Sequence, residues 1–315
     1  MKKIRILACI AFAFVSCSKS ETVTNSRAIA VTSTIDEVAT KAVVVASSSA
    51  LTDITFVRAD DVANNQTIFN FSNTPSITGS RAAGANSPIA FSTNAPTYDV
   101  TADKYAYLRG YHPVGTLSSE VVTWTPDGAT DILMTDVWNA GRYTVPVSSG
   151  MVFKHILARI EVICKADIDD AHALVQDTWG DITAIKFVDV QPNIEYTYAT
   201  NTLIADGTPI DFALLNSNTY TEAFDQTAIP ASSSSSAVTA SAMIVPTEAS
   251  TITLKVKAVN QAEQTIGPIT LSTSGTFGAG KVHTITLTFK SRDKEIEVTS
   301  LTVTDWTGQN INVEY

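Results

Sequence analysis

The sequence predicts an all-β protein made of two tandem β-sandwich domains. Apolar and polar residues alternate with a period of two over many short segments, which is the pattern of strands with one buried face. Turn residues such as Pro126-Asp127-Gly128 and Asp206-Gly207 separate these segments, and a helical period is scarce. Many short strands of this kind favour sandwiches, and the length suits about two domains of ~100–200 residues each.

The chain opens with the features of an export signal. Met1–Arg5 is basic, and Ile6–Val15 is an apolar run that is shorter than the ~20 residues needed to span a bilayer. Ser16 and Cys17 follow, and the sequence then turns polar, so the segment resembles the lipobox of a bacterial lipoprotein. This interpretation predicts a signal peptide over residues 1–16, cleavage before Cys17 and lipid on its thiol. The alternative is an ordinary secretory signal with a chance cysteine.

Composition argues against two classes of partner. The net charge is −10, and the sequence has no basic patch for the phosphates of a nucleic acid or for anionic lipid headgroups. Contact with a membrane therefore depends on the acyl chains of Cys17. Cysteine usage agrees with export, because Cys9 leaves with the signal peptide and Cys17 is acylated. Only Cys164 remains, so no intrachain disulfide is expected.

The N-terminal half begins with a polar tether and a first strand candidate, Ala28–Ile35. Further strands are predicted at residues 53–58, 88–92, 104–111, 121–125, 132–135 and 141–147. The best domain boundary lies near Val147–Gly150. The predicted organisation is a lipidated tether with a removable strand over 17–41, an N-terminal sandwich over 42–148 and a C-terminal sandwich over 149–315.

The C-terminal half has the clearest alternation. Strands are predicted at residues 151–164, 182–190, 194–198, 251–258, 282–289 and 296–303. In the last of them the apolar phase flips at Thr299-Ser300, which predicts a bulge because a one-residue shift exchanges the two faces of a strand. A short helix is predicted over Ala171–Thr178, with Asp169 or Asp170 as its candidate cap.

No motif in the chain specifies a catalytic or metal site. Residues 275–281 match the start of a phosphate-binding loop, but Val282 replaces the Ser or Thr that binds magnesium, and a strand follows instead of a helix. The four histidines lack metal-ligand spacing, no Gly-x-Ser-x-Gly elbow occurs, and Cys164 lies on the apolar face of its strand. An exported glycosidase would need two facing carboxylates, and nothing singles out a pair. The sequence therefore predicts a protein that is not an enzyme and that has no metal or other cofactor.

Three stretches share the order and spacing of a known family. They are residues 105–113 (YAYLRGYHP) followed by 124–134 (WTPDGATDILM), residues 152–162 (VFKHILARIEV), and residues 277–287 (FGAGKVHTITL) leading to 303–306 (VTDW). Over residues 100–310, together with the lipid signal, the chain resembles the fimbrillin-like lipoproteins, which are the type V pilins of Bacteroidales. The resemblance implies a rod of two transthyretin-like β-sandwiches that acts as a fimbrial subunit in cell adhesion.

The resemblance also implies how the subunit matures. Such pilins reach the outer membrane as lipoproteins, a trypsin-like protease cuts after Arg or Lys near the N-terminus, and a strand from the next subunit fills the vacated groove. The candidate cleavage sites here are Arg27 and Lys41, and only a cut after Lys41 expels the first strand. The candidate donor strand carries Ile311, Val313 and Tyr315 on one face; the alternative is that it pairs within its own domain.

The implied partners are other pilin subunits, in a homo- or heteropolymer, the processing protease, the outer membrane through the lipid on Cys17, and a host or bacterial surface receptor. The runner-up interpretation is a non-polymerising outer-membrane glycan-binding lipoprotein. A cluster of exposed Trp or Tyr on one face would favour it. Trp124, Trp138, Trp179 and Trp306 are scattered along the chain, so we expect each of them to pack against the core or its rim.

Overall fold

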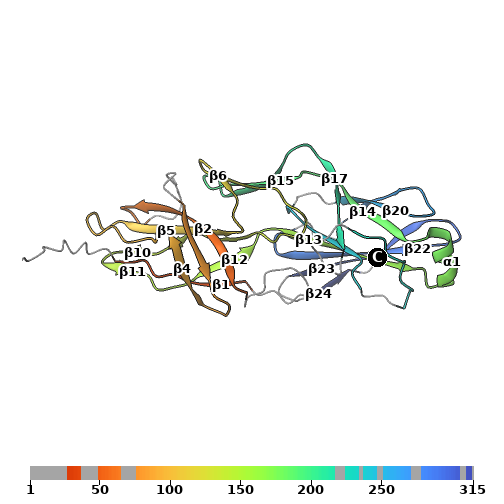
Figure 1. The fold of residues 1–315 in the computed structure, drawn as a ribbon, viewed down its shortest axis with the longest axis horizontal. Helices are drawn as coiled ribbons and strands as arrows, with labels where there is room; N and C mark the ends of the chain where they lie inside the picture. Colours follow the sequence, from red (N-terminus) through yellow and green to blue (C-terminus); the bar gives the residue numbers. More distant parts are fainter. Residues whose placement is uncertain are drawn as a thin grey trace, which may run out of the picture.

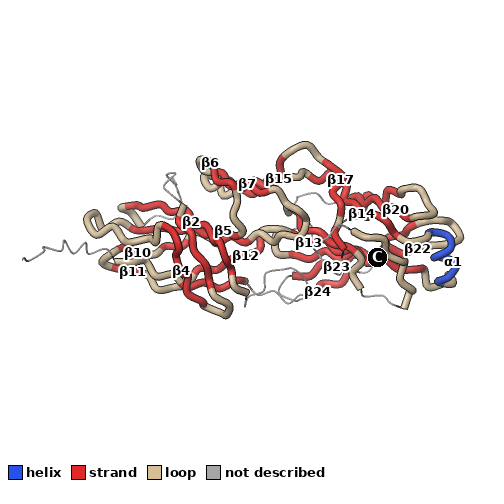
Figure 2. The backbone as a smooth tube through the Cα atoms, viewed as in Figure 1, coloured by secondary structure: helices blue, strands red, loops and turns tan. Residues whose placement is uncertain are grey.

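The chain folds into an elongated, almost all-β rod (Figures 1 and 2). The computed structural model describes residues 27–36, 49–64, 76–216, 224–233, 237–246, 251–270, 278–305 and 310–313. This part consists of short strands and one helix, α1 (His172–Trp179), which confirms the predicted all-β class. Within the same residues, no helix is long and apolar enough to cross a membrane.

The N-terminal half is a sheet that closes on itself. Its strands follow the order β2 (Leu51–Asp61), β3 (Ile77–Arg81), β4 (Ser87–Thr93), β1 (Thr32–Ile35), β12 (Met151–His155), β8 (Leu133–Thr135), β5 (Tyr105–His112) and β9 (Trp138–Asn139). β2 also pairs with β5, so seven strands form a ring, and β9 pairs with β5 next to β8. The interior is filled by apolar side chains that include Ile54, Phe56, Leu108 and Phe153. A ring of this kind leaves no unpaired edge between its strands.

The C-terminal half is a β-sandwich of two sheets. The larger sheet has the order β18 (Leu215–Asn216), β19 (Ala240–Ile244), β13 (Ala158–Ala166), β22 (Lys281–Phe289), β23 (Ile296–Asp305) and β24 (Asn310–Val313). The smaller sheet has the order β17 (Ile210–Ala213), β14 (Ile182–Val190), β20 (Thr251–Ala258) and β21 (Gln264–Thr270). Ile185, Leu254 and Leu287 belong to the apolar core between them. Val175 and Trp179 of α1 join the same core, so the helix covers one end of the sandwich (Figure 1).

A third sheet joins the two halves. It has the order β16 (Thr202–Asp206), β15 (Asn193–Thr197), β7 (Val121–Trp124) and β6 (Thr116–Ser118), with strands from both halves of the chain (Figure 1). A third apolar cluster includes Tyr111, Trp124, Tyr196 and Met243, which also come from both halves. The guanidinium carbon of Arg109 lies 4.6 Å from the ring centre of Tyr196. The two halves therefore share a packed contact as well as a covalent connection.

The chain crosses between the halves inside a segment that the sequence predicts as one strand. Residues 151–164 form two strands instead, because β12 pairs with β1 and β8 whereas β13 pairs with β19 and β22. Ile156 and Leu157 connect them. β12 follows the predicted boundary at residue 148 and yet belongs to the first sheet.

The predicted bulge in β23 is confirmed. Thr286 of β22 pairs with Ser300, whereas the next residue, Leu287, pairs with Val298. Thr299 is therefore the extra residue. It restores Leu301 to the core face after the phase flip, and Leu301 is fully buried.

The predicted helix is present, but its predicted cap is wrong. α1 begins after Ala171 and receives no hydrogen bond from a capping side chain. The carboxylate of Asp170 instead accepts a hydrogen bond from the backbone N–H of Ser291, at 2.6 Å. The Asp170 carboxylate thus pairs with a residue that is distant in the sequence, whereas the local capping rule predicted a hydrogen bond to the start of the helix.

The predicted strand at residues 141–147 is a hairpin of β10 (Gly141–Arg142) and β11 (Val145–Pro146). The carboxylate of Asp103 accepts hydrogen bonds from the backbone N–H of Thr144, at 3.0 Å, and from its hydroxyl, at 2.6 Å. Asp103 lies far away in the sequence, so the local alternation gave no sign of this turn.

Candidate functional site

β1 runs through the closed sheet between β4 and β12. It is antiparallel to β4, where Ser33 lies opposite Ser87, and parallel to β12, where Ile35 lies opposite Phe153. The strand predicted over Ala28–Ile35 is thus present in part, over Thr32–Ile35, and backbone pairing holds this part along both edges. Among the described residues it is also the first strand, so one cut after it separates it from the other described strands.

The segment around β1 turns one apolar face to the core. Ile29, Val31 and Ile35 are 2–3% exposed and belong to the cluster that fills the closed sheet. Burying one such side chain contributes ~1.5–3 kcal/mol. Without β1 the sheet would have two unpaired edges and an apolar groove between them. A groove of that kind takes up a strand from another chain, through main-chain hydrogen bonds and side-chain pockets.

One position on this face is small and polar. Ser33 is fully buried, and its hydroxyl donates a hydrogen bond to the carbonyl oxygen of Ser87 at 3.4 Å. The buried guanidinium of Arg81 donates to the carbonyl oxygens of Ser49, at 2.6 Å, and of Ser33, at 3.4 Å. It also donates to the carbonyl oxygen of Gly84. Sequence reasoning did not single out these residues. The alternation of the first strand could have marked Ser33 as inward-facing, whereas a lone arginine such as Arg81 carries no signal.

Arg27, one of the two candidate cleavage sites, lies just before the segment of β1. Its side chain is exposed, and its Nη1 lies 3.5 Å from the carbonyl oxygen of Tyr143. Its own carbonyl oxygen accepts a hydrogen bond from the backbone N–H of Tyr98 at 2.9 Å. The bond that a protease would cut is therefore part of a paired backbone. The other candidate, Lys41, lies outside the described residues, as does Cys17.

Two of the three candidate donor residues lie in β24. Ile311 pairs with Val303 of β23, and Val313 pairs with Leu301; Tyr315 lies outside the described residues. β24 is the last strand of the six-stranded sheet, so β23 is its only neighbour in the described part of that sheet. The structure thus places Arg27 and the donor candidates in different halves of the rod and does not bring them together.

The buried titratable groups favour structural roles. Burial lowers the pKa of His283 to about 4, and the positive charge of Lys281 adds to the effect. Burial raises the pKa of Cys164 to about 12, so its thiol stays protonated and unreactive near neutral pH. Among the described residues, no group of three or more His, Cys, Asp or Glu is placed to hold a metal ion.

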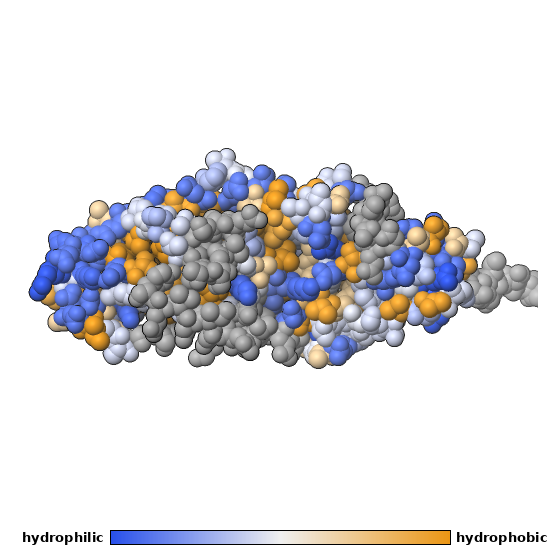
Figure 3. All heavy atoms as spheres, turned by 180° about the vertical axis from the view of Figure 1, so that it is seen from behind, coloured by the Kyte–Doolittle hydropathy of each residue, from blue (hydrophilic) through white to orange (hydrophobic). Residues whose placement is uncertain are grey.

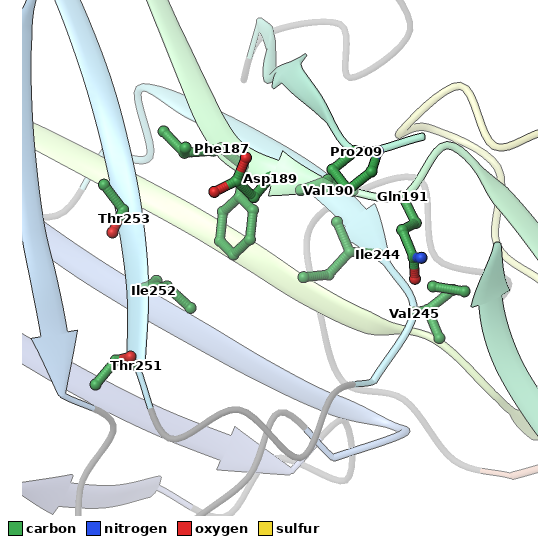
Figure 4. Close-up of a pocket in the computed structure, with 12 residues that line it drawn as sticks. Phe187, Asp189, Val190, Gln191, Pro209, Ile244, Val245, Thr251, Ile252 and Thr253 are labelled. Carbon is green, nitrogen blue, oxygen red and sulfur yellow. The ribbon is translucent and has the colours of Figure 1, made fainter. Parts of the chain in front are cut away.

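A hollow of about 340 Å³ opens between the two sheets of the C-terminal sandwich (Figure 4). Phe187 and Val190 from β14, Ile252 from β20 and Ile244 from β19 line it. Among the described residues that line the hollow, Asp189 is the single acidic one, so these residues do not supply the paired groups of a general acid–base site. Of the sequence-predicted site residues that the structure describes, Arg27, Ile311 and Val313 are not among the residues that line it.

Aromatic side chains are packed rather than displayed. Polar and apolar patches are interspersed on the face shown in Figure 3. Every Trp and Tyr in the described part of the chain is buried or half-buried, and Trp124, Trp138 and Trp179 are at most 7% exposed. Trp306 lies outside that part. The described residues therefore offer no exposed aromatic platform on which a sugar ring could stack.

A comparison with protein-family models identifies the family of this chain. A fimbrillin-like family model covers residues 30–306. The chain belongs to the fimbrillin-like family. Membership confirms the resemblance read from the sequence and makes the chain a fimbrial structural protein of the cell surface that associates with other pilin subunits.

The fimbrillin-like fold is shared with solved structures at low sequence identity. A proposed cell adhesion protein from Bacteroides uniformis aligns with a TM-score of 0.61 and 17% identity over 90% of this chain and 99% of that chain. A second such protein, from Bacteroides ovatus, has a TM-score of 0.55, 15% identity and the same two coverages. A third, from Parabacteroides distasonis, has a TM-score of 0.50 and 12% identity over 88% of this chain and 96% of that chain. These likenesses establish the fold, and no curated protein matches the chain in sequence.

Proposed function

We propose that this chain is a fimbrial subunit or accessory fimbrillin that polymerises by strand exchange and serves cell adhesion. It is exported as a lipoprotein and held in the outer membrane through Cys17. A trypsin-like protease then cuts after Lys41 or Arg27. The cut after Lys41 releases β1, a strand from the next subunit takes its place, and the filament grows toward a surface receptor.

The position of β1 carries this proposal. Because β1 is the first strand in the described part of the chain, a single cut on its C-terminal side detaches it and leaves the other described strands covalently connected. A strand in the middle of the sequence would need two cuts. Its removal uncovers the partners of Ile29, Val31 and Ile35 together with two unpaired sheet edges. The processed subunit is then unstable until another strand fills the groove, and this instability favours assembly.

β24 suits the complementary role of donor. Among the described strands it pairs with β23 alone, so its departure breaks a single described ladder of backbone hydrogen bonds. Ile311 and Val313 alternate along it, Tyr315 continues this alternation in the sequence beyond the described residues, and alternate side chains are the ones that enter the pockets of a groove.

The second candidate is a non-polymerising outer-membrane glycan-binding lipoprotein. Such a protein would keep its lipid and β1, and it would bind sugars through exposed aromatic rings. The packing of the described Trp and Tyr side chains favours the fimbrial subunit over this alternative.

The N-terminus of the cell-surface form tests the proposal. We expect mass spectrometry of sheared surface material to show a chain that starts at Ala42, or at Ala28 if Arg27 is cut. The double variant Arg27→Ala, Lys41→Ala should stay acylated at Cys17 and monomeric, whereas Lys294→Ala, which removes an exposed lysine of the C-terminal half, should be processed normally. Filaments of normal length from the double variant would overturn the proposal. A wild-type chain found only in the membrane, still acylated, would favour the glycan-binding alternative.

A further inference from the structure

The groove around β1 buries four inward-facing side chains of the strand that it holds. In chain order these are Ile29, Val31, Ser33 and Ile35, and all four are at most 3% exposed. The first, second and fourth are large and aliphatic and join the apolar cluster. The third is small and polar. A strand that replaces β1 in this register must supply the same order of large, large, small and large side chains.

The surroundings of Ser33 explain why its position must stay small. The hydroxyl of the buried Ser87 donates to the carbonyl oxygens of Ala83, at 3.1 Å, and Gly84, at 2.9 Å. The buried guanidinium of Arg81 donates to the backbone carbonyl oxygen of Ser33 at 3.4 Å. A leucine at position 33 would put a larger, apolar side chain into this fully buried site, where the Ser33 hydroxyl now bonds to the carbonyl oxygen of Ser87. Overpacking and buried polar groups without partners both weaken binding.

The candidate donor strand of this chain does not have that order. The residues in phase with Ile311 are Asp305, Thr307, Gln309, Val313 and Tyr315. We can lay any four consecutive members of this set over positions 29, 31, 33 and 35, in either chain direction. In all but one of these placements, Gln, Ile or Val falls at position 33. In the remaining one, Gln and Asp fall at positions 31 and 35. The residues that alternate with this set are Trp306, Gly308, Asn310, Asn312 and Glu314. They include one large apolar residue, Trp306, and so cannot supply the three that the positions of Ile29, Val31 and Ile35 require.

We infer that the β1 groove accepts a strand from a different pilin subunit and rejects residues 305–315 of a second copy of this chain. The inference rests on the strand exchange proposed above. The accepted strand has large apolar side chains at three alternate positions and Ser, Ala or Gly at the position of Ser33. The groove and the donor segment of this chain are therefore matched to different neighbours, which makes the filament a heteropolymer at this subunit.

Peptide exchange into the nicked chain tests the inference. A site for a specific protease is placed within residues 37–48, between β1 and β2, and the full mature chain is cut there so that β1 stays bound without a covalent link. Labelled peptides are then exchanged into the groove under mild urea, and fluorescence anisotropy measures their affinity. The wild-type peptide of residues 27–40 and its Ser33→Ala variant should bind equally. The Ser33→Leu peptide should bind at least ~10-fold more weakly.

Two controls distinguish the effect of the side chain at position 33 from the general affinity of the groove for a strand. Thr34 is half-buried and lies opposite Val152, on the outward face. A Thr34→Leu peptide should therefore bind like the wild type. The peptide of residues 305–315 should bind at least ~10-fold more weakly than the peptide of residues 27–40. With Thr307→Val and Gln309→Val it should remain weak, and the further change Ile311→Ser should restore binding because it puts a small residue at position 33.

The outcomes distinguish a failure of this inference from a failure of strand exchange. Equal binding of the Ser33→Leu or the 305–315 peptide would overturn the inference while leaving strand exchange intact. If no peptide enters the nicked chain, including the wild type, strand exchange itself fails and the inference fails with it. The uncut chain gives an independent check. Ser33→Leu should lower the unfolding temperature more than Thr34→Leu does, and equal unfolding temperatures would also overturn the inference.

Discussion

Nδ1 of His155 lies 2.7 Å from Oδ2 of Asp131, and both side chains are at most 3% exposed. His155 ends β12, and Asp131 lies two residues before β8. The pair therefore joins the neighbour of β1 to the next strand of the ring, just before the chain crosses into the second half of the rod. A buried polar pair of this kind fixes a local geometry, and it becomes costly when one partner is removed.

We expect Asp131→Ala to lower the free energy of unfolding by about 1–3 kcal/mol, because it leaves the imidazole of His155 in the interior without this partner. Urea denaturation measures the change. The matched control is Asp136→Ala, which removes an exposed ion pair with Lys154 and should cost less than about 1 kcal/mol. Similar losses of unfolding free energy from the two variants would show that the buried pair stabilises the chain no more than the exposed pair does.

The apolar face of β1 should contribute strongly to the stability of the unprocessed chain. We expect Ile35→Ala to cost about 2–5 kcal/mol, because Ile35 is 2% exposed and its loss leaves a cavity in the closed sheet. Thr34→Ala, on the outward face of the same strand, should change the free energy of unfolding by less than about 0.5 kcal/mol. Thermal unfolding of the uncut chains compares them, and a small effect of Ile35→Ala would argue that β1 is loosely bound.

Cleavage after Arg27 should be slow in the folded chain. The carbonyl oxygen of Arg27 is paired with the N–H of Tyr98, and the next residue, Ala28, bridges to Thr97. A protease must first open this pairing, so the rate follows the local opening equilibrium. We expect trypsin to cut this bond at least ~100-fold more slowly in the native than in the urea-unfolded chain, as measured by mass spectrometry over time. Equal rates would mean that this pairing does not protect the bond.

The depressed pKa of His283 should make the chain less stable in acid. Its pKa is about 4 in the folded state and 6.5 when unperturbed, so the unfolded chain binds the proton more tightly. The stabilisation is complete above pH 6.5 and is lost as the pH falls toward 4. From the two pKa values the loss is roughly 3 kcal/mol. Urea denaturation across this range should show a steeper decline for the wild type than for His283→Gln. Parallel curves would rule out His283 as the source.

Cys164 should report unfolding. With a pKa of about 12 and a side chain that is 1% exposed, its thiol should react with iodoacetamide at least ~100-fold more slowly in the native chain than in the unfolded chain. The measurement uses the Cys17→Ser variant after removal of the signal peptide, so that Cys164 is the single thiol. Rapid labelling of the native chain would contradict the burial of the β13 face.

Much of the secondary structure could be predicted from the sequence, because alternation records which face of a strand is buried. The strand at residues 182–190 agrees with β14, and the phase flip at Thr299 agrees with the bulge in β23. Strands such as β3 (Ile77–Arg81), β19 (Ala240–Ile244) and β21 (Gln264–Thr270) were missed. All five residues of β19 are buried, so no alternation marks it, and β3 buries an arginine where the pattern calls for an apolar residue.

By itself the sequence determined the all-β class and the family resemblance, since both are carried by local order and spacing. Only the tertiary structure decided which strands are neighbours. It closed the first sheet through the pairing of β2 with β5, and it split residues 151–164 between two sheets. It also placed Ser33 beside Arg81, although 48 positions separate them in the chain. The physical reason is that alternation encodes a buried face but not the partner across the ladder, which is fixed by long-range packing.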